Sequence, residues 1–192
     1  MNKWIDFYEQ FFPNRLVAQY FIEDLEAITD SKIPKHRAKI MMHQTQRLIT
    51  LADDVVNLRS NSDSLQLMFL IICTENIAKL YQNYKKGSKS KHFVRKFFKE
   101  LVCKNDQLIL ESNFFDHDNI ALDLMSIVDI FYKIRCDVVH EGKYWEFHFF
   151  DKINNTVMLN IDPDITIHMS ISELREIIGR ACVFAIQQTK KI

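Results

Sequence analysis

Glycine and proline are scarce in this chain, and their scarcity constrains the fold more than any other feature of the sequence. The 192 residues include only 3 glycines and 3 prolines. These two residue types interrupt helices most strongly and mark most tight turns. The sequence therefore favours a few long helices over a β fold with many turns. Because 47% of the residues are apolar, the chain can bury a sizeable core, and its length suits a single domain.

Apolar residues recur at helical spacing in several parts of the chain, with capping residues and breakers at their ends. Pro34 is well placed as a first helical residue, and Gly142 as the residue that follows a helix. Ser170 and Glu173 have the spacing of a capping box. We expect helices at residues 2–30 with a break at Pro13, 34–59, 64–84, 91–102, 116–141 and 170–191. The stretch 104–117 shows no clear pattern.

After Gly142 the apolar pattern changes from helical to roughly alternating. The segments YWEFHFF, TVMLNI and ITIHM are short and rich in β-forming residues, and turn-forming residues separate them. The sequence therefore predicts a mostly α fold, an antiparallel helical bundle over residues 34–192. A two- or three-stranded β insertion is expected at about 144–169, before the last helix. Residues 1–33 are expected to form a helical extension packed on the bundle.

Charge and cysteine usage exclude several functional classes. The 25 basic and 25 acidic residues cancel, so any binding of nucleic acid must rest on a local patch. The four cysteines form no CxxC pair, which argues against a zinc site and suits reduced cytosolic thiols. No apolar run is long enough to span a bilayer, and the charged first segment does not resemble a signal peptide. We expect a cytoplasmic protein without metal or cofactor.

The stretch FYKIRCDVVHEGK, residues 131–143, carries the strongest candidate for a functional site. Arg135 and His140 lie in the last two turns of a long predicted helix. Five residues advance an α-helix by about 500°, so the two side chains leave the helix about 140° apart. The spacing alone is common. A purely structural interpretation is that Arg135 pairs with a carboxylate and His140 interacts with the helix carboxyl end.

The context of this stretch makes it more specific. Strings of this kind, on the last long helix of an α bundle, resemble the signature of the HEPN superfamily, and the β insertion and SISELREII helix resemble its Apea-like branch. The helix IICTENIAKLYQNY, with Glu75, resembles the second bundle helix of that family. The resemblance covers roughly residues 35–190.

The resemblance implies a metal-independent endoribonuclease that cleaves RNA by attack of its own 2′-hydroxyl. His140 would act as general acid and base near neutral pH. Arg135 would stabilise the charged phosphorane with its planar set of donors. In the family, two protomers bring these helices together, and the cleft between them forms the site. Defence or a toxin-like stress response is the implied setting, with an antitoxin or regulatory protein as a further partner.

One position differs from the catalytic members of the family. They usually carry Asn, Asp or His directly after the arginine, whereas this chain has Cys136. This difference keeps open a non-catalytic HEPN module that binds a partner protein or a nucleotide, and a helical adaptor unrelated to HEPN. A Cys136–His140 nucleophile pair is a further alternative. The residues expected to support the site are Glu75, which can pair with Arg135, and Cys136, Asp137 and Glu141.

Residues 79–99 form the most basic segment of the chain. They contain eight lysines and arginines, no acidic residue and five interleaved aromatic residues. Such a segment can follow an RNA backbone and stack its bases. The alternative is a solvated loop whose phenylalanines face the core, as the shared helical face of Phe93 and Phe97 indicates. The predicted RNA-binding residues are Lys85, Lys86, Lys89, Lys91 and Arg95.

Overall fold

Helices form most of the chain in the computed structural model, which describes residues 2–30, 35–58, 62–84, 89–143, 147–149 and 165–191. The elements before residue 60 are α1 (Asn2–Tyr8), the 3-10 helix η1 (Glu9–Phe11), α2 (Arg15–Glu26) and α3 (Lys35–Leu58). The middle of the chain forms α4 (Asp63–Tyr81), α5 (Ser90–Lys96), the π-helical turn η2 (Phe97–Leu101) and α6 (Lys104–Glu111). The remaining elements are β1 (Phe114–Phe115), α7 (Leu124–Glu141), β2 (Thr166–Ile167) and α8 (Ile171–Lys190).

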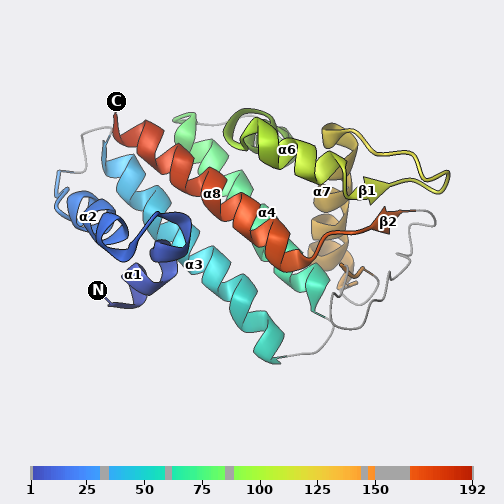
Figure 1. Cartoon of the computed structure of the whole chain (residues 1–192), viewed down its shortest axis with the longest axis horizontal. Coiled ribbons are helices and arrows are strands. Elements are labelled where there is room, and N and C mark those ends of the chain that lie inside the picture. Colours follow the sequence, from blue (N-terminus) through green and yellow to red (C-terminus); the bar gives the residue numbers. More distant parts are fainter. Residues whose placement is uncertain are drawn as a thin grey trace.

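Three long helices, α3, α4 and α8, form the centre of the bundle (Figure 1). Helix α3 runs in the direction opposite to α4, and α8 lies against both. Helix α4 also packs against α5 and α7. This central position agrees with its sequence, because a helix that is apolar on all sides is stable only when neighbours surround it. The predicted helical bundle is therefore confirmed. None of the described helices combines the length and apolarity needed to cross a membrane.

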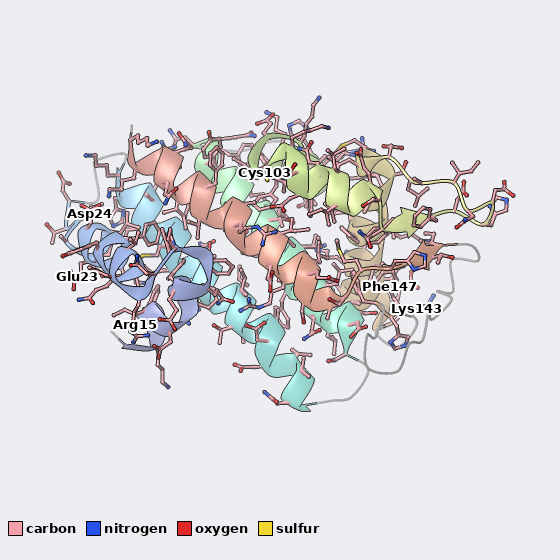
Figure 2. All side chains as sticks on the ribbon, viewed as in Figure 1. Arg15, Glu23, Asp24, Cys103, Lys143 and Phe147 are labelled. Atoms are coloured by element: carbon pink, nitrogen blue, oxygen red, sulfur yellow. The ribbon has the colours of Figure 1, made fainter. Side chains whose placement is uncertain are left out.

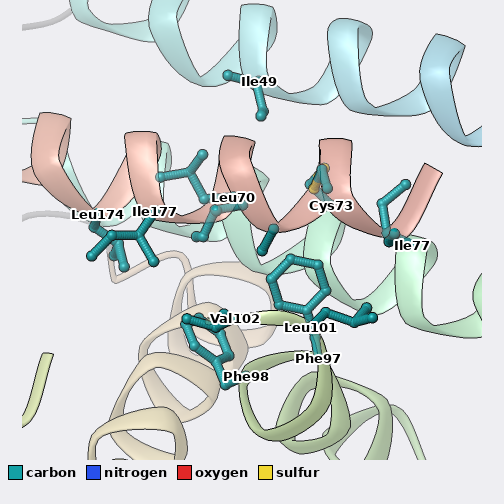
Figure 3. Close-up of a cluster of buried hydrophobic side chains, with 14 of the residues drawn as sticks. Ile49, Leu70, Cys73, Ile77, Phe97, Phe98, Leu101, Val102, Leu174 and Ile177 are labelled. Atoms are coloured by element: carbon teal, nitrogen blue, oxygen red, sulfur yellow. The ribbon is translucent and has the colours of Figure 1, made fainter. Parts of the chain in front are cut away.

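Aliphatic and aromatic side chains from α3, α4, η2 and α8 meet in the core (Figure 3). Burial of each large apolar side chain contributes about 1.5–3 kcal/mol. Phe97 and Phe98, which are adjacent in sequence, are both fully buried, because the wider π turn directs consecutive residues inward. The core residues labelled in Figure 3 are Ile49, Leu70, Cys73, Ile77, Phe97, Phe98, Leu101, Val102, Leu174 and Ile177.

The side chain of Gln107 stabilises this π turn. Its amide nitrogen donates hydrogen bonds to the backbone carbonyls of Phe98, Lys99 and Val102, at 2.9, 3.2 and 3.1 Å. Carbonyl groups that a π turn leaves without regular helical partners are therefore satisfied inside the protein. The predicted helix over 91–102 is present, but it changes from α to π geometry at Phe97.

The N-terminal helices pack on α3 and α8. The Tyr8 side chain is fully buried, and its hydroxyl donates a hydrogen bond to the Met42 carbonyl at 2.6 Å. The ring of Phe11 covers Gly179 of α8 so closely that a Cβ atom at this glycine would overlap it. Side chains of α1 and α2 thus share one continuous core with the bundle. The domain division at residue 33 stays a prediction.

The start of α7 differs from the prediction. The sequence predicts that this helix starts near Asp116–Asp118, but it starts at Leu124. There the Asp123 carboxylate accepts hydrogen bonds from the backbone N–H groups of Met125 and Ser126. Asp116 instead accepts from the backbone N–H groups of Asp118 and Ile120, at 3.0 and 2.8 Å, and thereby closes a turn. Several aspartates before α7 could cap a helix. The first of them, Asp116, stabilises the turn, and Asp123 caps the helix.

Two other predicted helix ends are confirmed. Gly142 follows α7 with φ 68°, the left-handed conformation that glycine adopts at low cost. The Ser170 side chain and the Glu173 carboxylate form the expected capping box at α8. Pro34, the predicted first residue of the second helix, lies outside the described residues.

The β structure departs from the prediction in its pairing. β2 pairs with β1, a strand that precedes α7, in antiparallel register with Phe114 opposite Ile167. The predicted insertion, by contrast, implies strand pairing within residues 144–169. Residues 147–149 form no strand and instead contact the start of α4, where Asp63 accepts from the Phe149 N–H at 2.7 Å. Figure 2 labels Phe147 in this segment. The rest of the predicted insertion, 144–146 and 150–164, lies outside the described residues.

Candidate functional site

Arg135 lies on the side of α7 that packs on α4, and Glu75 of α4 faces it. The guanidinium Nη2 lies 3.7 Å from the Glu75 carboxylate, and the two side chains are only 18% and 9% exposed. The other carboxylate oxygen of Glu75 accepts a hydrogen bond from Lys79, one turn further along α4. The structure therefore contains the expected Glu75–Arg135 ion pair. Partial burial strengthens its electrostatic attraction relative to a surface pair.

The hydrogen-bonding capacity of Arg135 is far from saturated. Its Nε is buried and has no hydrogen-bond partner in the part of the chain that the structure describes. Within the described ranges, its Nη1 has only a 4.0 Å contact with the Cys136 sulfur. An arginine carries five N–H donors, and a buried donor without an acceptor costs about 1–3 kcal/mol. Arg135 is thus held in place by charge. Because its Nε is closed to solvent, an incoming anion could be bound only through the terminal nitrogens Nη1 and Nη2.

Tyr132 is a neighbour of Arg135 that the sequence reasoning missed. Its ring centre lies 5.8 Å from the guanidinium carbon, within cation–π range. Burial raises the pKa of the Tyr132 hydroxyl, and the nearby Cys136 thiol and Glu75 carboxylate raise it further, although Arg135 opposes them. The available signal was spacing, because Tyr132 precedes Cys136 by four residues on the same helix face.

His140 lies on the solvent side of α7 and is exposed, whereas Arg135 faces α4. This arrangement agrees with the angle of about 140° expected from helical geometry. One chain therefore does not place these two side chains on one face. Asp137 is partly buried, and its backbone carbonyl accepts hydrogen bonds from the N–H groups of Gly142 and Lys143.

Glu141 is occupied by a local ion pair at the end of α7. Its carboxylate lies 2.6 Å from the Lys143 ammonium, and both side chains are about half exposed. The hydrogen bond and charge of Lys143 lower the pKa of Glu141. Lys143 is labelled in Figure 2. A surface pair of this kind contributes little to stability, so the predicted supporting role of Glu141 stays a prediction.

The predicted RNA-binding residues differ in their surroundings. Lys91 and Arg95 of α5 both pair with Asp129 of α7, while Lys89 is exposed. Lys85 and Lys86 lie outside the described residues. The basic segment contains no acid in sequence, but the fold supplies one from 34 residues away.

The aromatic part of the basic segment faces the core. Phe93, Phe97 and Phe98 are buried, so their rings are not available to stack on bases. The expectation that Phe93 and Phe97 belong to the core is confirmed. Tyr84 packs on Phe93 with ring centres 4.7 Å apart. Stacking on bases by these three phenylalanines is therefore excluded, whereas Tyr81 and Tyr84 are only partly buried.

Cysteines and potential metal ligands do not gather around Arg135. Cys73 and Cys182 lie together in the core, with sulfur atoms 3.9 Å apart, and Cys103 is exposed. Cys136 is partly buried beside Tyr132 and Arg135. Among the described residues, no three His, Cys, Asp or Glu side chains are grouped so that they could hold a metal ion.

The comparisons with known proteins add no relative to this picture. The chain matches no protein-family model, no curated protein and no solved structure in these searches. Evidence on the role of this chain therefore comes from its sequence pattern and from the geometry around α7.

Proposed function

We propose that this chain is a HEPN-type endoribonuclease that cleaves RNA without a metal ion. The main support for this proposal is the environment of Arg135. Its charge is anchored by Glu75, its side chain is 18% exposed, and among the described residues its Nη1 has only a 4.0 Å contact with the Cys136 sulfur. An arginine in this state is suited to a phosphate, whose oxygens accept from the planar guanidinium. The resemblance of residues 131–143 and the helical bundle support the same assignment.

In the proposed reaction, the RNA 2′-hydroxyl attacks the adjacent phosphorus. The bond from O2′ to phosphorus forms and the bond from phosphorus to O5′ breaks. The products are a 2′,3′-cyclic phosphate and a 5′-hydroxyl. A base removes the 2′-hydroxyl proton, and an acid returns a proton to O5′. Histidine is the side chain best suited to such transfers near neutral pH, and His140 is exposed where RNA can reach it. Arg135 stabilises the negative charge of the phosphorane.

The proposed site is composed of two copies of the chain. Arg135 and His140 leave α7 on different sides, so one copy does not present both to one phosphate. In a homodimer with the α7 helices side by side, His140 of one copy approaches Arg135 of the other copy. We place this dimer in the cytoplasm, in defence or a toxin-like stress response, with an antitoxin or regulatory protein as its partner.

Cys136 favours a second candidate function. Catalytic relatives carry a polar residue at this position, whereas the Cys136 sulfur packs beside Arg135 and Tyr132. In this alternative the chain is a non-catalytic HEPN module that binds a partner protein or a nucleotide through the same surface.

The test is cleavage of single-stranded and tRNA-like RNA by the purified chain in excess chelator. We expect cyclic-phosphate ends, and a loss of about 10²–10⁴-fold in rate for His140→Ala, the range of general acid–base catalysis. His117→Ala is a matched control, because His117 is exposed and lies in the turn before α7. Cleavage that survives both His140→Ala and Arg135→Ala would exclude the proposed chemistry. Intact RNA with the unmodified dimer would favour the non-catalytic module.

A further inference from the structure

Two cations of α5 converge on one carboxylate of α7. Arg95 donates from Nε to Asp129 at 2.7 Å, and its Nη2 donates to the second oxygen of the same carboxylate. The Lys91 ammonium lies 2.9 Å from that second oxygen. The Lys91 and Arg95 side chains are 44% exposed, and Asp129 is 30% exposed. The cluster therefore lies at the surface, where another anion can reach it.

The geometry of this cluster is also that of phosphate recognition. Arginine binds a carboxylate and a phosphate through the same pair of parallel N–H donors. Burial alone would raise the pKa of Asp129, but the hydrogen bonds and charges of Arg95 and Lys91 outweigh it and lower that pKa. Asp129 is thus an anion at neutral pH, in a position that a phosphate group could take.

Asp129 also lies on the outer face of α7 that bears His140. The two residues are eleven apart, which returns a helix to within about 20° of the same direction and advances it by about 16 Å. Cys136 lies between them on the same face, about 20° to the other side. The Lys91–Arg95 cations therefore flank one end of a helix face whose other end carries His140.

We propose that Asp129 is an internal counter-ion that occupies the phosphate position of an RNA-binding surface formed by Lys91 and Arg95. RNA binds there by displacing the Asp129 carboxylate, and this competition lowers the affinity of the chain for single-stranded RNA. The inference rests on the proposed function for its choice of RNA as ligand. It assigns a function to the pairing of two cations of the basic segment with a carboxylate from another helix.

The test is the binding of a fluorescent 2′-O-methyl oligouridylate of about 20 nucleotides, measured by anisotropy over a range of salt concentrations. This probe lacks the attacking hydroxyl, so binding is measured without cleavage. Asp129→Asn is expected to tighten binding about tenfold at low salt. It should also steepen the slope of log affinity against log salt by about 1.4, the value for two additional phosphate contacts on a single strand.

Two controls separate this effect from a change in net charge or in folding. Asp118→Asn removes the same charge from an exposed turn whose described contacts involve no α5 cation, and it should leave the affinity nearly unchanged. Replacing both Lys91 and Arg95 by Gln should abolish the gain in the Asp129→Asn background. The same double replacement should weaken binding by the unmodified chain to a smaller extent, because there the Asp129 carboxylate already offsets one of the two positive charges.

The outcomes distinguish this inference from the proposed function. The counter-ion role is overturned if Asp129→Asn binds the probe no more tightly than Asp118→Asn does. It is also overturned if neither variant binds the probe at all. Tighter binding without cleavage by any variant supports the counter-ion role while the catalytic proposal fails. If cleavage depends on His140 but Asp129→Asn leaves the affinity unchanged, the catalytic proposal is supported and the counter-ion role fails.

Discussion

Replacing Glu75 by Gln removes the charge that anchors Arg135, and its effect on stability can be worked out from the structure. At the 3.7 Å separation of Arg135 and Glu75, an effective dielectric constant of about 20 gives an attraction of about 4.5 kcal/mol. Part of this loss is recovered because the neutral amide carries no desolvation penalty for a charge. Breaking a fully buried pair costs about 3–5 kcal/mol. Since Arg135 and Lys79 keep some contact with water, we expect a loss of about 2–3 kcal/mol, below that range.

The assay is urea unfolding of a double-mutant cycle over Glu75→Gln and Arg135→Gln. Each single variant should lower the free energy of unfolding by about 2–3 kcal/mol with an unchanged m-value. The double variant should lose less than the sum by about 1–2 kcal/mol, because residues in direct contact are not additive.

The matched control is Glu176→Gln on α8. Glu176 lies 3.6 Å from Arg180, nearly the same separation, but these side chains are 61% and 45% exposed. Surface pairs of this kind contribute about 0–1 kcal/mol. Additive effects of the Glu75 and Arg135 variants, or a Glu75→Gln effect no larger than that of the control, would refute the reasoning from partial burial.

Three further predictions concern stability. Gly179→Ala should lower the free energy of unfolding by about 1–3 kcal/mol, the cost of overpacking, and this penalty should shrink in a Phe11→Ala background, both measured by urea unfolding. Ser170→Ala should cost about 1 kcal/mol in the same assay, because it removes the α8 cap. The folded-state pKa of Asp129 is lowered, so its stabilisation is complete above its unfolded pKa of about 3.9 and is lost as the pH falls through the folded value. The stability difference between the unmodified chain and Asp129→Asn should therefore shrink below about pH 4 in acid-unfolding curves.

Local signals predicted most of the fold correctly. The capping box at Ser170 and the left-handed Gly142 follow from residues adjacent in sequence, so they could be recognised without the structure. The start of α7 could not, because Asp116 and Asp123 are chemically equivalent caps. Only the tertiary structure, with β1 just before the turn, decides between them. The pairing of β1 with β2 likewise joins segments that local patterns do not connect.

Contacts in the candidate site could be predicted where a charged residue stands in an otherwise apolar helix. Glu75 stands in an otherwise apolar helix, and a buried carboxylate needs a cation, so its pairing with Arg135 could be expected. Asp129 gave no such signal, since it lies on a mixed helix and meets its cations only after α5 and α7 pack together. Tyr132 was missed because an aromatic residue on an amphipathic helix usually belongs to the core.

The contact between Phe11 and Gly179 has a consequence for the order in which the protein completes its fold. The two residues are separated by most of the chain, and at roughly 5–20 residues per second a ribosome needs about 10–30 s to make the intervening segment. Throughout that interval η1 lacks the α8 surface that it covers in the finished protein. Helices α3 and α4 can already pair, but the N-terminal segment can pack in its final position only after α8 has been synthesised. Closure of the bundle therefore has to follow the synthesis of α8, and it joins two segments that the ribosome makes far apart in time.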